Sequence, residues 1–219
     1  MNNVKKRFVD LWNRCAKTSF QEPQSSEVAE AVFYQLEALY GQPWRRYHCF
    51  SHIEWCLYYF DECRQYADSP DALELAIWFH DCIYTIGASD NEALSRDWFL
   101  DHSEGYLEES IREFVAMYIM DTYHRDNPSS EDGKLMVDID LSNLGAKWDI
   151  YIKDSEAVMA ELMLLEPVTE RSVKEQVLVF LQNLLDRKYI YHSPHYRTYF
   201  ETMAQTNIAR YSASLKASL

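Results

Sequence analysis

Residues 75–81, Leu-Ala-Ile-Trp-Phe-His-Asp, are the feature that most constrains how this chain folds. The run is apolar on most faces of a helix, which predicts a helix at the centre of the protein. It ends on His80 and Asp81, and ionisable groups are costly to bury without partners. A divalent metal ion is one such partner, because imidazole nitrogen and carboxylate oxygen are ordinary metal ligands.

Composition and periodicity together predict an all-α protein. The chain has 219 residues, 47% of them hydrophobic and 15% aromatic, with only five glycines and six prolines. That length and composition suit one domain, residues 1–219, with a substantial core. Residues 135–145 alternate like a strand, but no partner strand is evident, so we expect a short helix with a bend. Apolar stripes and start signals predict the other helices near residues 3–17, 26–40 (capped by Ser25 or Ser26), 50–66, 71–80, 107–123, 148–165, 169–185 and 195–215, with one more after Ser89.

The charge balance argues against nucleic acid as a partner. Lys and Arg number 21 against 35 Asp and Glu, which gives a formal net charge of −14. A surface of this sign repels the backbone of a nucleic acid duplex. A small phosphorylated ligand is still compatible, because a bound metal ion reverses the local field.

Cysteine usage and the N-terminal stretch indicate a cytoplasmic protein. The five cysteines form no CxxC pair, and Cys49, Cys56 and Cys63 recur every seventh residue, as a buried stripe of small side chains would. Free thiols suit a reducing cytosol. Residues 1–15 are typical of an amphipathic helix rather than a signal peptide. No apolar run approaches the roughly 20 residues that span a bilayer, so no membrane partner is expected.

Two histidine segments and one distant aspartate supply candidate metal ligands. His52, His80, Asp81 and Asp140 could form a set of four around one cation. Adjacent residues on a helix point about 100° apart, so His80 and Asp81 reach one ion only at a helix end or beside a second metal. From the residues alone, helix capping or a buried ion pair remains the competing interpretation.

A second layer of candidate residues surrounds these four. His48 precedes His52 by four residues, His124 follows an apolar helical stripe, and Glu92 lies on the helix after Asp81. They could bind a second ion, hold phosphate or transfer protons. Taken singly, His124 suits a surface or capping role and Glu92 a salt bridge.

Two arginines and one glutamate also have competing interpretations. Arg45 and Arg46 could clamp phosphate, since guanidinium binds it in bidentate fashion, but solvation at the surface would also explain at least one of them. Glu161, taken alone, is typical of a solvated helix face. The segments around these residues also carry motifs that can be compared with those of known families.

Several separated segments occur in a familiar order and together resemble the HD superfamily of metal-dependent phosphohydrolases. The likeness is greatest to a bacterial branch of predicted HD phosphohydrolases, and it extends over about residues 40–210. The segments that carry it are Pro43, Arg45, Tyr47, His48 and His52; residues 74–84; Asn91, Glu92 and Ser95; residues 138–145; and Arg187, Ile190, Tyr191, Glu201, Ala204 and Asn207.

The resemblance implies an HD-type helical bundle and a role for each candidate residue. His52, His80, Asp81 and Asp140 would hold one or two divalent ions, with Mn, Fe, Co, Ni, Zn and Mg not distinguished. The catalytic residues would be Asp81, His124 and Glu92, and the substrate-binding residues Arg45 and His48. The implied reaction is hydrolysis of a small phosphoester, nucleotides included, by metal-activated water.

Two alternatives and one departure from the family pattern accompany this expectation. Some HD proteins hold two irons and activate oxygen, and a helical module could keep a metal only as a structural staple. Relatives usually carry an arginine two residues before the glutamate that corresponds to Glu161, where this chain has Met159. If that arginine lines the pocket in relatives, substrate choice here differs. The sequence leaves the oligomeric state open.

Overall fold

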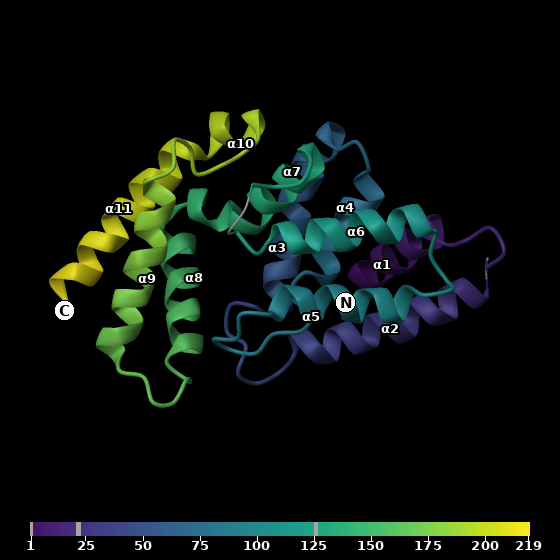
Figure 1. Cartoon of the computed structure of the whole chain (residues 1–219), viewed down its shortest axis with the longest axis horizontal. Helices are drawn as coiled ribbons and strands as arrows, with labels where there is room; N and C mark the ends of the chain where they lie inside the picture. The colour runs from purple at the N-terminus through teal and green to yellow at the C-terminus, as the bar shows by residue number, and fades with distance from the viewer. Residues whose placement is uncertain (1, 21–22, 125–126) are drawn as a thin grey trace.

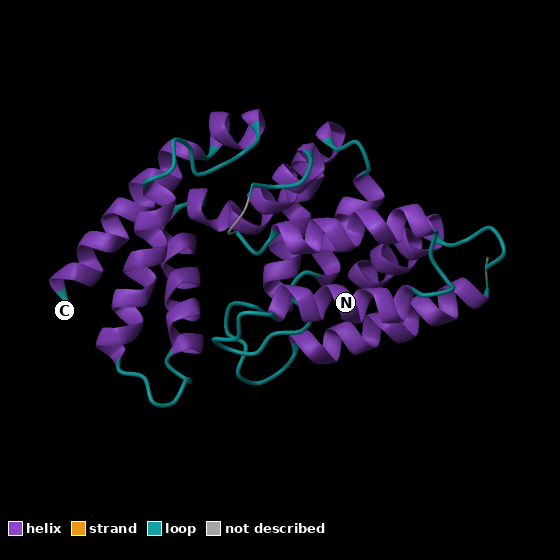
Figure 2. Ribbon diagram, viewed as in Figure 1, coloured by secondary structure: helices purple, strands orange, loops and turns teal. Residues whose placement is uncertain are grey.

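Helices account for nearly all of the regular structure in this protein, as the composition predicts. The structure is a computed structural model that describes residues 2–20, 23–124 and 127–219. Within these ranges it contains eleven α-helices and two 3-10 helices, and one isolated bridge between Ala16 and Leu107 in place of any strand (Figure 2). The all-α prediction is therefore confirmed. None of the helices in these ranges is both long enough and apolar enough to cross a membrane.

The helices follow one another with short connections (Figure 1). In chain order they are α1 (Asn2–Cys15), α2 (Gln24–Tyr40), α3 (Phe50–Cys63), η1 (Arg64–Tyr66), α4 (Pro70–Phe79), α5 (Asn91–Ser103), α6 (Glu109–Asp121), α7 (Glu131–Asp140), η2 (Leu141–Gly145), α8 (Trp148–Leu162), α9 (Glu170–Leu185), α10 (Pro194–Tyr199) and α11 (Glu201–Ala217).

Helix α4 lies at the centre, as its apolar sequence predicts. Pro70 occupies its first turn, where a missing N–H costs nothing, and every residue from 72 to 79 is buried. The helix packs against α1, α3, α6 and α7. Trp78 meets the edge of Phe8 from α1 with ring centroids 5.2 Å apart. Burying a large apolar side chain contributes about 1.5–3 kcal/mol, so this helix anchors the core.

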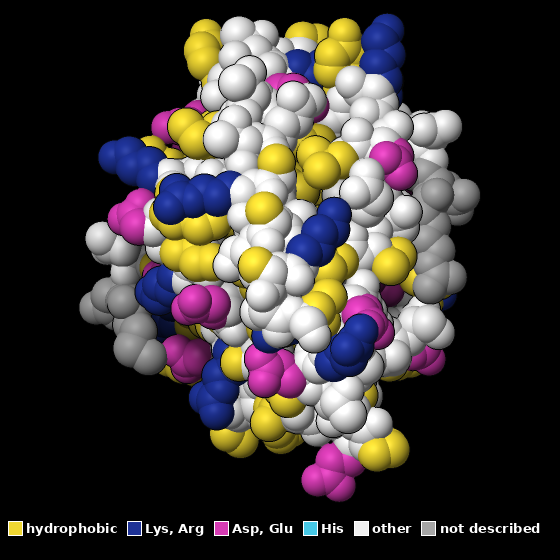
Figure 3. All heavy atoms as spheres, turned by 90° about the vertical axis from the view of Figure 1, so that its left-hand side faces the viewer, with side chains coloured by type: hydrophobic (Ala, Val, Ile, Leu, Met, Phe, Trp, Pro, Cys, Tyr) yellow, Lys and Arg dark blue, Asp and Glu magenta, His cyan; other side chains and the backbone are white. Residues whose placement is uncertain are grey.

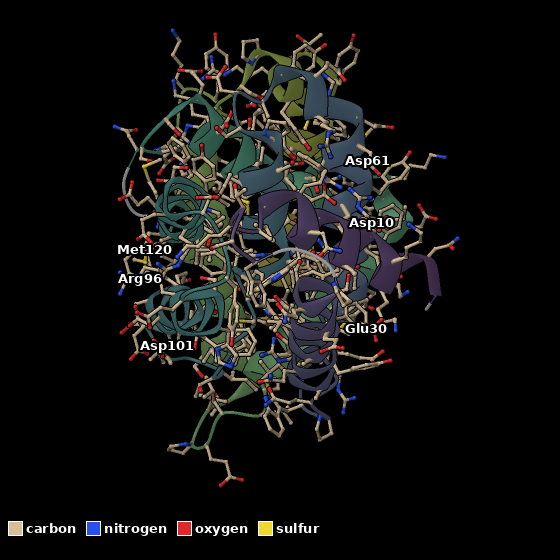
Figure 4. The ribbon with its side chains drawn as sticks, turned by 90° about the vertical axis from the view of Figure 1, so that its right-hand side faces the viewer. Asp10, Glu30, Asp61, Arg96, Asp101 and Met120 are labelled. Atoms are coloured by element: carbon tan, nitrogen blue, oxygen red, sulfur yellow. The ribbon has the colours of Figure 1, made fainter. Side chains whose placement is uncertain are left out.

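A network of charged side chains holds α1 to α3 and α4. The Arg7 guanidinium donates to Asp61 at 2.7 Å and to the buried Glu74 at 2.6 Å. Arg64 donates to the other oxygen of Glu74 at 2.7 Å, so that both oxygens of this buried carboxylate are paired. Figure 4 shows Asp61 on the face of the molecule where α1 lies.

Residues 131–145 form a short helix with a bend, as predicted. Helix α7 begins after Ser130, whose side chain accepts a hydrogen bond from the N–H of Gly133, and it ends at Asp140. The tighter η2 follows directly. The Asn207 side chain of α11 donates to the carbonyls of Leu144 at 2.9 Å and Ala146 at 2.8 Å, tying η2 to the C-terminal helices. Helices α8, α9 and α11 pack against one another beyond it (Figure 1).

Two predicted helix features differ in the structure. Helix α2 begins after Pro23 with no side-chain cap, because the Ser25 hydroxyl bonds to Asn13 of α1 instead. The single helix expected over residues 195–215 is broken at Phe200, where φ is −120°. The break lets the Phe200 ring pack against Tyr59 of α3, with centroids 5.5 Å apart, so tertiary packing outweighs local helix continuity.

Candidate metal centre

The four predicted metal ligands lie together, and each comes from the end of a helix. His52 is in the first turn of α3, His80 and Asp81 directly follow α4, and Asp140 is the last residue of α7. Because three helices end at one point, ligands far apart in sequence share one buried position. His80 and Asp81 are at a helix end, which is one of the two arrangements that the sequence analysis allowed for ligation of one ion.

The distances between these donor atoms suit a single cation. His52 Nε2 lies 3.2 Å from both His80 Nε2 and Asp140 Oδ1. His80 Nε2 lies 3.3 Å from Asp81 Oδ2 and 3.4 Å from Asp140 Oδ1. Two atoms bonded to one ion at about 2.1 Å are separated by about 3.0 to 3.4 Å. Asp81 Oδ2 is 3.8 Å from His52 Nε2, so this pair would have to close slightly. The described groups whose donor atoms lie within reach of one ion are His52, His80 and Asp81, and His52, Cys56 and Asp140. The clustered groups could therefore bind a metal ion.

Hydrogen bonding orients His80 for this role. Its Nδ1–H donates to the Ile77 carbonyl at 3.0 Å, which directs Nε2 toward the other donors. Metal-binding histidines commonly use a backbone carbonyl in this way to fix the ring and the tautomer. The fit to a cation thus extends beyond the donor atoms themselves.

The cluster's electrostatics also favour a positive charge at its centre. Burial alone would raise the pKa of Asp81 and Asp140, but nearby imidazoles hold both pKa values below the ordinary one. Conversely, burial would lower the pKa of His80, yet the two carboxylates raise it well above the ordinary value. A proton on His80 therefore compensates the buried carboxylates when no cation does.

Cys56 adjoins the cluster, although the sequence analysis assigned it only to a buried stripe. Its Sγ lies 3.6 Å from His52 Nε2, one helical turn away. Burial raises the pKa of this thiol well above its usual value. Cys56 is nevertheless a further candidate ligand, because its sulfur and donor atoms of His52 and Asp140 lie within reach of one ion. Cys63 is buried as predicted, whereas Cys49 precedes α3 and is partly exposed. The four-residue spacing from His52 was the available signal for Cys56.

Glu161 holds His48 and the turn before α3, whereas its sequence position suggested a solvated face. The carboxylate is fully buried. Its Oε1 accepts the backbone N–H groups of Arg46, Tyr47 and His48 at 2.6, 2.8 and 3.0 Å. Its Oε2 lies 2.5 Å from His48 Nδ1 and accepts the Tyr84 hydroxyl at 3.1 Å. These donors outweigh burial and lower the pKa of Glu161 to about 2.

His48 therefore stands beside the metal centre in a fixed orientation. Its ring stacks on Tyr84 with centroids 4.2 Å apart. Burial would lower its pKa, but the hydrogen bond to Glu161 and the charge of Asp81 raise it above the ordinary value. A protonated His48 is suited to meet an anion.

Arg45 differs from the phosphate clamp that the sequence analysis expected. It is 5% exposed, and its Nη1 donates to the carbonyls of His48 at 2.9 Å and Asp81 at 2.7 Å. Its Nη2 donates to the Cys82 carbonyl at 2.8 Å, and its Nε to Gln42 at 3.1 Å. Because these bonds use most of the guanidinium's N–H groups, Arg45 joins the turn before α3 to the segment that carries Asp81.

His124 and Glu92 both lie close enough to the cluster to interact with it. His124 Nε2 is 2.9 Å from Asp140 Oδ2, and its backbone has the left-handed φ of 58°, which is uncommon outside glycine. Its Nδ1 is buried with no hydrogen-bond partner among the described residues. Partial burial and the negative charge of Asp81 raise the pKa of Glu92, so this carboxyl binds a proton more readily than usual.

A hollow of about 550 Å³ beside His124 carries positive charge that sequence reasoning missed. Arg187, Lys188 and Arg197 line it, and none of them forms an ion pair with a described carboxylate. Arg187 Nη2 donates to the His124 carbonyl at 3.1 Å. Burial and the charges of the two arginines lower the pKa of His192, another lining residue. In a chain with a net charge of −14, this concentration of cations could hold an anion.

The comparisons with known proteins add no relative. No family model, no curated protein and no solved structure matches this chain. The geometry of the cluster and of its surroundings is therefore the evidence on which a function is argued.

Proposed function

We propose that this protein is a metal-dependent phosphohydrolase of the HD type that acts on a small phosphoester. The observation that carries the proposal is the convergence of His52, His80, Asp81 and Asp140 at separations that suit one cation. The order of these residues in the chain resembles the HD superfamily. A divalent ion bound there supplies Lewis acidity, which polarises a phosphoryl group and lowers the pKa of water.

The residues around the cluster suit binding of a phosphoryl group. Arg187, Lys188 and Arg197 provide positive charge next to His124 that no carboxylate of the described residues pairs with. His48, with its raised pKa, lines the same cavity as His124 and Asp140. Charges fixed in advance stabilise the extra negative charge of a phosphoryl transition state. These side chains, rather than Arg45, would then bind the phosphate of the substrate.

Two side chains are suited to proton transfer. Asp140 holds the His124 ring at Nε2, so a proton can pass between this imidazole and the carboxylate at the candidate cation site. Glu92, whose pKa is raised, can give a proton to a leaving alcohol oxygen. Hydrolysis breaks the P–O bond to the alcohol, and the attacking water supplies the new oxygen on phosphorus.

Metal analysis combined with an activity panel tests the proposal. We expect the purified protein to contain a divalent metal and to release phosphate from phosphoesters. His80→Ala should remove both, whereas the control His102→Ala, outside the cluster on α5, should retain both. Phosphate release by a metal-free His80→Ala variant would refute the proposal.

The same measurements separate the alternatives. A pair of irons with oxygen-dependent turnover would support a di-iron oxygenase. Tightly bound metal without turnover on any substrate would support a structural metal, since such sites have closed coordination spheres.

A further inference from the structure

A cavity of about 370 Å³ extends from the metal centre into the C-terminal helices. His48, His124 and Asp140 form the end that meets the centre. The opposite end lies between α8 and α9, which pack against each other and against α11. A volume of this size is ordinary for a site that binds a small molecule.

The far part of this cavity is apolar. Val158 and Leu162 from α8 face Val177, Phe180 and Leu181 from α9 across it. The only ionisable carboxylate among the described lining residues is Asp140, at the metal end. Phe180 is 44% exposed and forms part of the rim, and Figure 3 shows hydrophobic side chains among charged ones on this side of the molecule. An occupant would therefore meet charge at one end and hydrocarbon at the other.

Tyr151 supplies a further sign that a ligand belongs here. Its side chain is fully buried and lines the cavity, and its hydroxyl lacks a hydrogen-bond partner within the described ranges. Ser155, one turn along α8, affects the pKa of the phenol, but no hydrogen bond of ordinary geometry joins the two hydroxyls. Buried polar groups rarely remain unpaired, so this hydroxyl is available to a bound molecule.

We propose that this cavity binds the apolar part of the substrate, which is the phosphoester of an alkyl or aryl alcohol. The inference rests on the proposed phosphohydrolase function and names its substrate class. The phosphate lies at the metal end near His48 and His124, and the hydrocarbon lies between α8 and α9. Hydrolysis adds water across the ester P–O bond, giving inorganic phosphate and the alcohol, which is released from the cavity.

Nucleotides fit this arrangement less well. A nucleobase is recognised through hydrogen bonds to its edge, and a site gains selectivity from such bonds. The facing side chains Val158, Leu162, Val177 and Phe180 offer none, and although Asn143, Tyr151, Ser155 and Gln176 also line the cavity, apolar side chains form most of its far part. Apolar burial instead makes affinity grow with hydrocarbon length.

Two valines on α9 provide a matched pair of variants. Val177 lines the cavity, whereas Val179 is 61% exposed and does not line it. With wild-type holoenzyme, kcat/KM should rise about fourfold per methylene from methyl to butyl to hexyl phosphate. Val177→Trp should lose at least tenfold on hexyl phosphate and little on methyl phosphate, while Val179→Trp should behave as wild type. If Val177→Trp fails to fold, Val177→Ala, which enlarges the cavity, is measured in its place.

A binding measurement separates this inference from the proposed function. Calorimetry with methyl-, butyl- and hexylphosphonate, which cannot be hydrolysed at a P–O ester bond, should show Kd falling with length in the wild type and the Val179→Trp variant. If binding depends on chain length but no ester releases phosphate, the inference about the cavity stands and the proposed phosphohydrolase function is overturned. Phosphate release that favours nucleoside monophosphates, with no dependence on alkyl length, would keep the hydrolase and overturn the cavity inference. If neither phosphonate binding nor phosphate release is observed, both proposals are overturned.

Discussion

Replacing Glu161 by glutamine tests how the turn before α3 is held. The carboxylate accepts three backbone N–H groups on Oε1 and meets His48 and the Tyr84 hydroxyl on Oε2. In Glu161→Gln the amide oxygen can still accept the backbone groups. The amide nitrogen, a donor, then faces His48 Nδ1 and a donating phenol. The variant therefore loses the charge and acquires two unfavourable contacts while its volume is unchanged.

The pKa of Glu161 sets the size of the effect. Its pKa falls from the ordinary 4.5 to about 2 in the folded protein. Each pKa unit corresponds to about 1.4 kcal/mol, so the folded state favours the charged form by about 3 kcal/mol. A depressed carboxyl pKa stabilises the fold above the unfolded value and ceases to do so as pH falls through the folded value. At pH 7 the variant should lose about 2–3 kcal/mol, and in a chain of this length each kcal/mol corresponds to about 2–4 °C in Tm.

Thermal unfolding of wild type and variant between pH 7 and pH 4 measures this. The Tm difference should be largest at pH 7 and should begin to narrow below about pH 4.5. Glu156→Gln, at an exposed position of the same helix, is the control and should change Tm by less than 2 °C at any pH. A Glu161→Gln deficit that stays constant as pH falls, or one that the control shares, would refute the reasoning.

Three further predictions concern the surroundings of the metal centre. Gly133→Ala should lower stability by about 1–3 kcal/mol in denaturant unfolding, because its Cβ would lie 2.0 Å from Asp121 Oδ2, which anchors the loop that carries His124. Arg45→Lys should lower Tm by several degrees, since an ammonium cannot reach all the carbonyls that the guanidinium joins, and an unchanged Tm would contradict that structural role. Arg197→Ala should raise KM for phosphoesters severalfold in steady-state kinetics while leaving the metal content unchanged, and a normal KM would exclude the cationic hollow from substrate binding.

The sequence predicts the centre of the fold well, because local pattern and tertiary position agree there. The apolar run that ends in His80 and Asp81 has no face suited to water, so it lies at the core. Ser69 and Pro70 mark where this helix begins. The bend after Asp140, where the 3-10 helix η2 begins, falls within the segment 135–145 in which the sequence predicts one. The spacing of the histidines and aspartates indicated the candidate ligands, but only the packing of α3, α4 and α7 brings them together.

Features that depend on partners distant in sequence were not predictable in this way. Glu161 occupies an ordinary helix position, and nothing near it reveals the N–H groups of a turn 115 residues away. Arg45 resembles a phosphate ligand until its carbonyl partners are known. The break at Phe200 reflects contact with Tyr59 rather than any helix-breaking residue. Arg187 belongs to a segment that carries the resemblance, but nothing in the sequence placed it, Lys188 and Arg197 beside His124.

The two hydrogen bonds from Asn207 to η2 couple the far end of the chain to the metal centre. They fix the carbonyls of Leu144 and Ala146, just after the bend that begins at Asp140. Deleting α11 would leave those carbonyls unpaired and free the segment that positions a metal ligand. If a metal ion is bound at this centre, cleavage near the C-terminus by a protease would weaken its retention before the N-terminal helices unfolded, and a chelator would in turn hasten that cleavage.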